Sequence, residues 1–309
     1  MAIPSNSTKT LKLNNGLSIP AVGLGTWQST DEEAYNAVIA ALKAGYRHID
    51  TAYCYGNEEP VGRAIKDSGV PRKDIFITTK LWGTDHTRAE EGLDKSLKLL
   101  GLDYVDLFLM HWPVPMNPNG NHDKFPTLPD GKRDILLDWN FVDTYREMQK
   151  LVASGKTKAI GVSNFSITNL KKLLADSQIT IKPVVNQVET HGYLPQHKLL
   201  EYAKENDIVL EAYSPLGSTG APLLKDELVQ ELAKKNGISE STLLISWSVW
   251  RGIVVLPKSV TPSRIADNLK IIELSDEDGK KLNELASIRG EKRLVSPPWD
   301  PIVVFNDED

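Results

Sequence analysis

The chain has 309 residues, a mass of 34.3 kDa, 40% hydrophobic residues and a formal net charge of −5. Its Lys and Arg residues form no dense block, and no apolar run approaches the ~18 residues that cross a bilayer, so we expect no nucleic-acid or membrane partner. The single cysteine, Cys54, excludes an internal disulfide, and the first ten residues lack the apolar core of a signal peptide, so we expect a cytoplasmic protein.

The first predicted element is a β-hairpin. Residues 10–13 and 17–19 alternate in polarity and flank Asn14-Asn15-Gly16, which is a turn sequence. We expect this hairpin to precede the main fold.

Short apolar runs then alternate with amphipathic helical stretches, as in βα units around a parallel sheet. The eight expected strands are residues 21–25, 48–50, 75–80, 105–111, 159–163, 184–189, 209–213 and 254–256. Helical stretches include residues 32–42, 89–100, 141–152, 167–175 and 196–205. Thr30 and Glu33 are spaced as a capping box before the first helix. This pattern predicts a (β/α)8 TIM barrel, with residues 1–309 forming a single domain.

Two segments have no clear period. Residues 112–138, rich in Pro, Asn, Gly and Asp, are too long for a plain βα connection, and such loops are usually functional or disordered. The tail after Gly290 shows neither helical nor strand spacing. We make no prediction of either conformation.

Polar residues follow three of the expected strands. Asp50 ends the second strand and Tyr55 follows it, Lys80 ends the third and His111 ends the fourth. In a parallel barrel these side chains converge at one mouth and would form a proton-transfer site. Taken one at a time, Asp50 and Lys80 could be a structural ion pair, His111 a core histidine and Tyr55 an ordinary loop residue.

A nucleotide site is suggested near the end of the barrel. The Gly-rich segment at residues 23–28 lacks the third glycine and the acidic residue of a dinucleotide fingerprint, which disfavours a Rossmann fold. Residues 256–264 follow the last strand and offer an amine, hydroxyls and a guanidinium where many barrels bind phosphate. The alternative is a capped helix start with solvated charges.

These motifs resemble the aldo-keto reductases. Residues 45–52, followed by Tyr55, Asn57-Glu58 and Val61-Gly62, resemble the first signature of that family, and Lys258-Ser259 with Arg264 and Asn268 resembles its cofactor signature. The resemblance covers nearly the whole chain and extends to fungal NADP-dependent glycerol dehydrogenases and aldehyde or carbonyl reductases. It implies NADPH-dependent reduction of aldehydes and ketones to alcohols.

The resemblance also implies roles for the four polar residues. Tyr55 would protonate the carbonyl oxygen, and the Lys80 ammonium would lower the pKa of the Tyr55 phenol. Asp50 would orient Lys80, and His111 would orient the substrate carbonyl.

The same resemblance implies a cofactor site and a substrate pocket. The expected cofactor contacts are Ser163, Asn164 and Gln187 at the carboxamide, Tyr213 on the ring, Thr26, Trp27, Ser214, Leu216 and Ser218 near the pyrophosphate and ribose, Lys258, Ser259, Val260, Thr261 and Arg264 around the 2′-phosphate, and Asp267 and Asn268 near adenine. The expected pocket walls are Trp27, Cys54, Trp82, Trp112 and Trp299, which suit apolar or flat carbonyl compounds. No His or Cys cluster has metal-ligand spacing, so we expect no metal.

Gln28, Gly220 and Asp267 differ from the residues of the animal members of the family at these positions. We therefore expect weaker contacts that enclose the cofactor and faster cofactor release.

Two alternatives stay open: a non-catalytic NADPH-binding subunit, and an aldolase that forms a Schiff base on Lys80. We expect a monomer or weak homodimer. The sequence leaves the physiological substrate and the direction of the reaction in the cell open.

Overall fold

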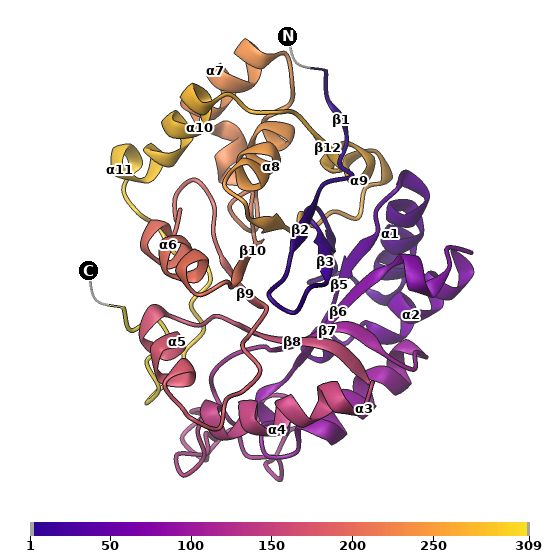
Figure 1. The fold of residues 1–309 in the computed structure, drawn as a ribbon, viewed down its shortest axis with the longest axis vertical. Coiled ribbons are helices and arrows are strands. Elements are labelled where there is room, and N and C mark those ends of the chain that lie inside the picture. The colour runs from indigo at the N-terminus through magenta and orange to yellow at the C-terminus, as the bar shows by residue number, and fades with distance from the viewer. Residues whose placement is uncertain (1–2, 308–309) are drawn as a thin grey trace.

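Eight parallel strands form the barrel of the computed structural model, which describes residues 3–307. Figure 1 shows the strands in the middle of the molecule with helices around them. The strands, in their order around the sheet, are β4 (Leu24–Gly25), β5 (His48–Asp50), β6 (Phe76–Leu81), β7 (Val105–Met110), β8 (Thr157–Ser163), β9 (Val185–Glu189), β10 (Val209–Tyr213) and β11 (Val254–Val255). Parallel bridges from Val22 to Val255 and from Gly25 to Lys258 join the first strand to the last. The predicted (β/α)8 barrel is therefore confirmed.

The helices pack mainly on the outside of these strands. They are α1 (Asp31–Ala44), α2 (Glu58–Asp67), α3 (Ala89–Leu100), α4 (Phe141–Ala153), α5 (Ile167–Leu174), α6 (His197–Glu205), α7 (Glu227–Asn236), α8 (Glu240–Trp250), α9 (Pro262–Asn268), α10 (Asp276–Asn283) and α11 (Leu285–Arg289). The predicted capping box is present: Glu33 N donates to Thr30 Oγ1 at 3.4 Å, and Thr30 N donates to Glu33 Oε2 at 2.8 Å. Helix α1 ends at Gly45, whose φ of 112° lies in the left-handed region that favours glycine.

The N-terminal hairpin closes one end of the barrel. Strands β2 (Thr10–Lys12) and β3 (Ser18–Pro20) pair antiparallel, as the turn sequence predicted. Leu13 and Ile19 are buried against side chains of the barrel interior, including Leu107. Asn14 Nδ2 donates to the carbonyl oxygens of Pro183 and Asp207, which ties the turn to the segments that enter β9 and β10. A further pair, β1 (Ser5–Asn6) with β12 (Lys270–Ile271), holds the start of the chain.

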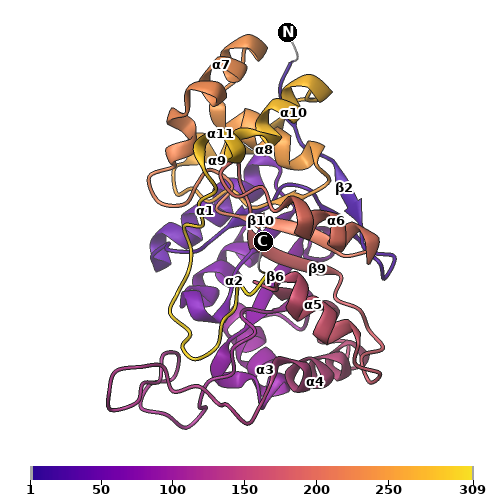
Figure 2. The same ribbon diagram turned by 90° about the vertical axis from the view of Figure 1, so that its left-hand side faces the viewer.

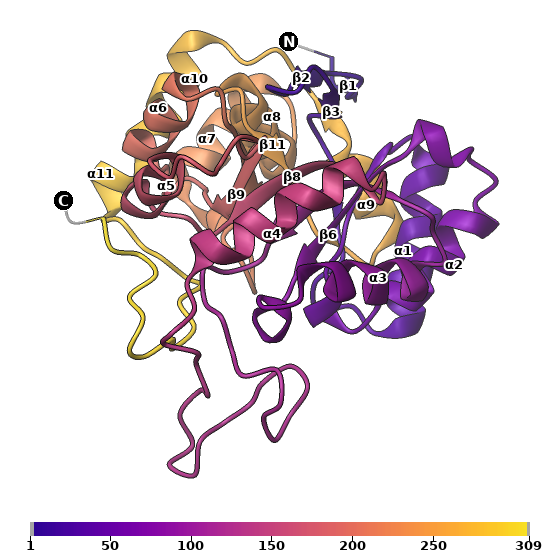
Figure 3. The ribbon, with the colours of Figure 1, turned by 60° about the horizontal axis from the view of Figure 1, so that its bottom comes forward.

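The connection between β7 and α4 and the C-terminal tail extend from the same end of the barrel (Figures 2 and 3). Antiparallel bridges between Met116 and Ile135 and between Thr127 and Arg133 brace the connection. The connection depends on contacts within its own irregular segment, and the tail depends on contacts with β9 and α5, so no periodic pattern in the sequence predicts either conformation. Within residues 3–307, no helix has the length and apolar character needed to span a membrane.

Candidate active site

The barrel brings three of the four predicted catalytic side chains into direct contact. Lys80 Nζ donates to Asp50 Oδ1 at 2.6 Å, to the hydroxyl oxygen of Tyr55 at 3.1 Å and to the carbonyl oxygen of Thr51 at 3.0 Å. Asp50 ends β5 and Lys80 lies near the end of β6, so the parallel register places both at one mouth. Tyr55 is brought over them by the short 3-10 helix Tyr53–Tyr55.

His111 completes the group at the end of β7. Its ring meets the Tyr55 ring edge to face, with 5.6 Å between the ring centroids. Burial, together with the Lys80 charge, holds the pKa of His111 well below its usual value of 6.5. The imidazole is therefore neutral near pH 7 and can offer a substrate a hydrogen bond but not a positive charge.

Two opposing effects set the charge of the lysine. Burial alone would lower the pKa of Lys80, but the Asp50 carboxylate and the Tyr55 hydroxyl group together outweigh burial and raise the pKa of Lys80 above its ordinary value. The side chain is therefore an ammonium at neutral pH.

Two opposing effects also act on the pKa of the Tyr55 phenol. Burial raises the pKa of Tyr55 to about 12, and the Lys80 ammonium opposes only part of that rise. Lys80 therefore acts in the expected direction, but the pKa of Tyr55 still lies above its ordinary value, because the cost of a buried phenolate exceeds the stabilisation by the nearby cation.

A second carboxyl group, absent from the sequence analysis, lies beneath this cluster. Gln187 Nε2 donates to Asp50 Oδ2 at 2.8 Å and to Glu211 Oε2 at 3.1 Å. Glu211 Oε1 lies 3.4 Å from His48 Nε2. Burial, followed by the charge of Asp50, raises the pKa of Glu211 to about 8. One sequence feature could have identified Glu211: it is a charged residue in the middle of the otherwise apolar strand β10.

A cavity of about 480 Å³ opens above the four side chains. Tyr55, Asp50 and His111 line it, whereas Lys80 lies fully buried behind them. Of the predicted cofactor and pocket residues, the cavity is lined by Thr26, Trp27, Cys54, Trp82, Trp112, Ser163, Asn164, Gln187, Tyr213, Ser214, Leu216, Ser218, Lys258 and Trp299. Ser259, Val260, Thr261, Arg264, Asp267 and Asn268 lie outside it, on α9 or just before it.

Polar side chains on the floor of the cavity hold one another in place. Tyr213 donates its hydroxyl hydrogen to Asn164 Oδ1 at 2.7 Å, and Asn164 Nδ2 donates to the carbonyl oxygen of His111 at 2.9 Å. Ser163 Oγ donates to the carbonyl oxygen of Gln187 at 2.8 Å. Asn164 has a φ of 61°, a costly conformation for a residue other than glycine, which turns its side chain into this network. These contacts orient the floor before any ligand binds.

One rim of the cavity is cationic. Lys258 is exposed and its Nζ donates to the carbonyl oxygen of Gln28 at 3.3 Å, which joins the segments after β4 and β11. Arg264 is exposed nearby in sequence on α9, while Asp267 pairs with Lys270 at 2.8 Å. This rim suits an anionic group such as a phosphate.

Another wall of the cavity is aromatic. Trp299 lies with its ring centroid 5.3 Å from Trp112 and 6.2 Å from Trp82, so the tail and two barrel loops meet there. Burial raises the pKa of Cys54 to about 12, so this wall residue is a thiol rather than a reactive thiolate. The long connection adds Phe125 and Arg133 to the lining, which the sequence analysis missed because that segment has no period.

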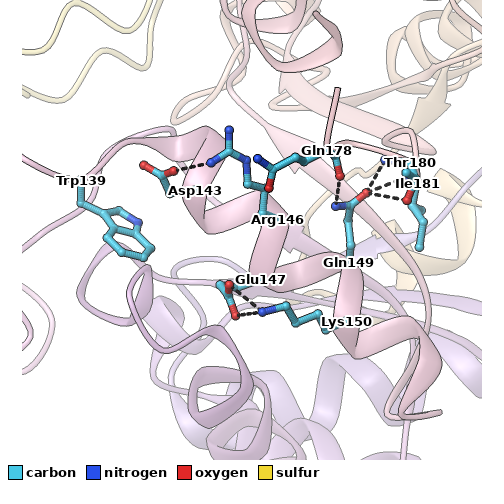
Figure 4. A pocket seen from close by; sticks show the side chains of 9 residues that line it. All are labelled: Trp139, Asp143, Arg146, Glu147, Gln149, Lys150, Gln178, Thr180 and Ile181. Carbon is cyan, nitrogen blue, oxygen red and sulfur yellow. Dashed lines mark hydrogen bonds and ion pairs between the residues drawn. The ribbon is translucent and has the colours of Figure 1, made fainter. Parts of the chain in front are cut away.

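A second hollow, of about 530 Å³, lies on the outside of the barrel along α4 (Figure 4). Its charged side chains are paired with one another or with neighbours: Arg146 with Asp143 and Asp176, and Lys150 with Glu147. This hollow is an open, internally neutralised groove, so the barrel mouth is the candidate active site. Among the described residues, no three His, Cys, Asp or Glu side chains are grouped to hold a metal ion.

Comparisons with known proteins agree with this site. The aldo/keto reductase family model matches residues 21–287. The chain is 56% identical over 305 residues to a glycerol 2-dehydrogenase (NADP(+)) of Saccharomyces cerevisiae, with 97% of this chain and 98% of the relative covered. It is also 56% identical over 304 residues to a D-galacturonate reductase of Hypocrea jecorina, with 96% and 98% covered.

A solved structure supports the fold. The aldose reductase of Schistosoma japonicum superposes with a TM-score of 0.84 and 38% sequence identity, covering 92% of this chain and 98% of that one. The chain therefore belongs to the aldo/keto reductase family. It is an oxidoreductase that reduces carbonyl groups to alcohols.

Proposed function

We propose that this chain reduces aldehydes and activated ketones with NADPH, and that Tyr55 is the general acid. The observation that carries the proposal is the contact between the Lys80 ammonium and the Tyr55 hydroxyl, 3.1 Å long, behind the floor of a cavity with one cationic rim. Relatives with similar sequences include an NADP-dependent dehydrogenase and a uronate reductase, so their names span neutral and acidic substrates.

The chemistry follows from the charge that develops at the carbonyl oxygen. When bound, NADPH supplies a hydride to the carbonyl carbon. Tyr55 protonates the oxygen as negative charge appears there, and the neutral His111 imidazole hydrogen-bonds and orients it. Lys80 stabilises the phenolate that Tyr55 leaves behind, and Asp50 keeps the ammonium charged and pointed at the phenol.

The residues present fit the proposed cofactor. The Nε2 atom of Gln187 is engaged with Asp50 and Glu211, which leaves the amide oxygen of Gln187 to accept a hydrogen bond from a carboxamide. Ser163 and Asn164 are its polar neighbours on the cavity floor, and Tyr213 offers a ring face. Lys258, Ser259, Thr261 and Arg264 would surround a 2′-phosphate, with Val260, Asp267 and Asn268 beside them.

The aldolase alternative is not supported. A Schiff-base lysine must lose its proton to attack a carbonyl, whereas the Asp50 carboxylate raises the pKa of Lys80. The enzymatic names of the relatives give no support to a non-catalytic subunit.

Steady-state assays with NADPH and NADH test the proposal. We expect an aromatic aldehyde to be reduced to its alcohol, with kcat/KM at least about tenfold higher with NADPH, because charge-assisted contacts to the 2′-phosphate are lost with NADH. Lys258→Met should lower the ratio of kcat/KM with NADPH to kcat/KM with NADH, mainly because KM for NADPH rises. Equal efficiency with both cofactors in the wild type would reject the proposed phosphate contacts, and absence of turnover would reject the function.

A further inference from the structure

We propose that the substrate end of the cavity recognises carbonyl compounds that carry a carboxylate, and that Arg133 binds this carboxylate. The inference rests on the reductase function proposed above and names a substrate class for the same site. It adds a charged group to the apolar or flat carbonyl compounds that the aromatic walls led us to expect.

Arg133 is held at the cavity by the backbone of the long connection. It lines the same cavity as Tyr55. Its main chain pairs with Thr127 in an antiparallel bridge, and the next residue, Asp134, donates its N–H to the carbonyl oxygen of Pro126 at 3.0 Å. Farther back, Trp82 Nε1 donates to a carbonyl oxygen of the same connection. These contacts hold the main chain of Arg133 in place beside the cavity.

Aromatic side chains in successive contact lie between the Arg133 guanidinium and His111. Arg133 Cζ lies 4.8 Å from the centroid of the Phe125 ring, which meets Trp82 edge to face at 5.4 Å. Trp82 in turn meets His111 at 5.2 Å. A substrate that lies along these rings, with its carbonyl at His111 and Tyr55, points its far end toward Arg133.

The charges of the wall favour an anion at that far end. Asp50 is the one acidic residue among those that line the cavity, and Lys80 already neutralises it. Within residues 3–307, Arg133 has no ion-pair partner, and its interaction is the cation–π contact with Phe125. Such a contact is worth only about 0.5–1 kcal/mol at an exposed site, so it leaves the guanidinium donors available.

A second cation strengthens the positive field. Lys124 Nζ lies 5.0 Å from the centroid of the Tyr53 ring, on the same connection as Arg133. Burial raises the pKa of Cys54, and both Lys124 and Arg133 oppose that rise. Their positive potential therefore reaches the residue next to Tyr55. It would attract an acidic substrate and orient it.

The reaction itself is unchanged for an acidic substrate. The hydride adds to the carbonyl carbon and the Tyr55 proton goes to the carbonyl oxygen, so an aldehyde acid gives a hydroxy acid and NADP⁺. The carboxylate takes no part in bond making. Arg133 acts as a binding residue for it.

Two rigid compounds of the same length test the assignment. The ratio of kcat/KM for 4-carboxybenzaldehyde to kcat/KM for its methyl ester, methyl 4-formylbenzoate, is measured in the wild type, Arg133→Met, Arg133→Lys and Lys132→Met. Comparing ratios between variants removes the intrinsic reactivity of each aldehyde. Lys132 is an exposed neighbour outside the cavity lining and serves as the matched control.

We expect the ratio to fall about tenfold in Arg133→Met through a higher KM for the acid, to recover in part in Arg133→Lys, and to stay at the wild-type value in Lys132→Met. An unchanged ratio in Arg133→Met, or an equal fall in Lys132→Met, would overturn the assignment. If neither compound is reduced by the wild type, the proposed function fails instead.

Discussion

At the scale of single residues, the environment of Tyr55, the proposed general acid, shifts the pKa of the phenol in two opposing directions. Burial raises the pKa of Tyr55 to about 12, and Lys80 offsets part of that effect. The phenol therefore stays protonated near neutral pH. This state suits the role proposed for Tyr55 in reduction, in which it would give up a proton, whereas in the oxidation of an alcohol the phenolate would be needed.

The two directions of the reaction should thus respond differently to pH. Reduction should stay level from about pH 6 to 9 and decline only toward the pKa of the phenol, while alcohol oxidation should rise with pH across that range. Profiles of kcat/KM in both directions check this expectation. A decline in reduction centred near neutrality would show that the phenol titrates far lower than its burial implies.

The identity of the four catalytic candidates was predictable, but their ionisation was not. Asp50, Lys80 and His111 each follow an apolar run, and that pattern places them at one mouth of a parallel barrel. The pKa of Tyr55 depends on how deeply the completed barrel and its loops bury the phenol, which no local pattern records. Glu211 was missed for a related reason, since its role depends on contacts with Gln187 and His48 from other strands.

At the scale of elements, the strands and most helices follow from periodicity, whereas the C-terminal tail depends on two distant anchors. Glu189, at the end of β9, accepts hydrogen bonds from Leu294 N at 2.7 Å and Val295 N at 2.8 Å. Asp307 Oδ1 accepts one from Thr168 N at 2.8 Å in the first turn of α5. Trp299 lies between these anchors and is buried in the aromatic wall.

Loss of the hydrogen bonds at Glu189 or Asp307 should therefore displace Trp299 from the aromatic wall and leave the cationic rim around Lys258 unchanged. We expect Glu189→Gln and Asp307→Ala to raise KM for a bulky aromatic aldehyde several-fold. Asp307→Ala should also lose about 1 kcal/mol of stability, because an N–H group in the first turn of α5 loses its side-chain acceptor. Steady-state kinetics measures KM, NADPH titration measures the affinity at the cofactor rim, and denaturant unfolding measures the stability. Glu291→Ala, an exposed change in the same tail, is the control. An unchanged KM in both anchor variants would contradict this account.

At the scale of the whole molecule, barrel closure links strands that are far apart in sequence. Gln187 in β9 joins Asp50 in β5 to Glu211 in β10, across the inside of the barrel. Burial raises the pKa of Glu211 to about 8, so the folded state holds a proton there that the unfolded chain releases near the ordinary value of 4.5. The stability that this proton provides is present below the unfolded pKa and is lost as pH rises through the folded pKa.

The substitution Glu211→Gln removes the part of the pH dependence of stability that comes from ionisation of Glu211. Between about pH 6 and 8 we expect the wild type to lose roughly 2 kcal/mol of unfolding free energy relative to the variant, which has no carboxylate to bury. Denaturant unfolding of both proteins at several pH values measures the difference. A constant difference across that range would mean that Glu211 does not change protonation in the folded state.

The central claim is that Tyr55 donates the proton that accompanies reduction. The most direct measurement is the single-turnover rate of NADPH oxidation by an aldehyde in the wild type and Tyr55→Phe, with NADPH affinity measured in parallel. We predict a fall of about 10²–10⁴-fold in the rate with NADPH affinity unchanged within about twofold. A fall of less than about tenfold would contradict the claim, as would a loss of rate explained by lost NADPH binding.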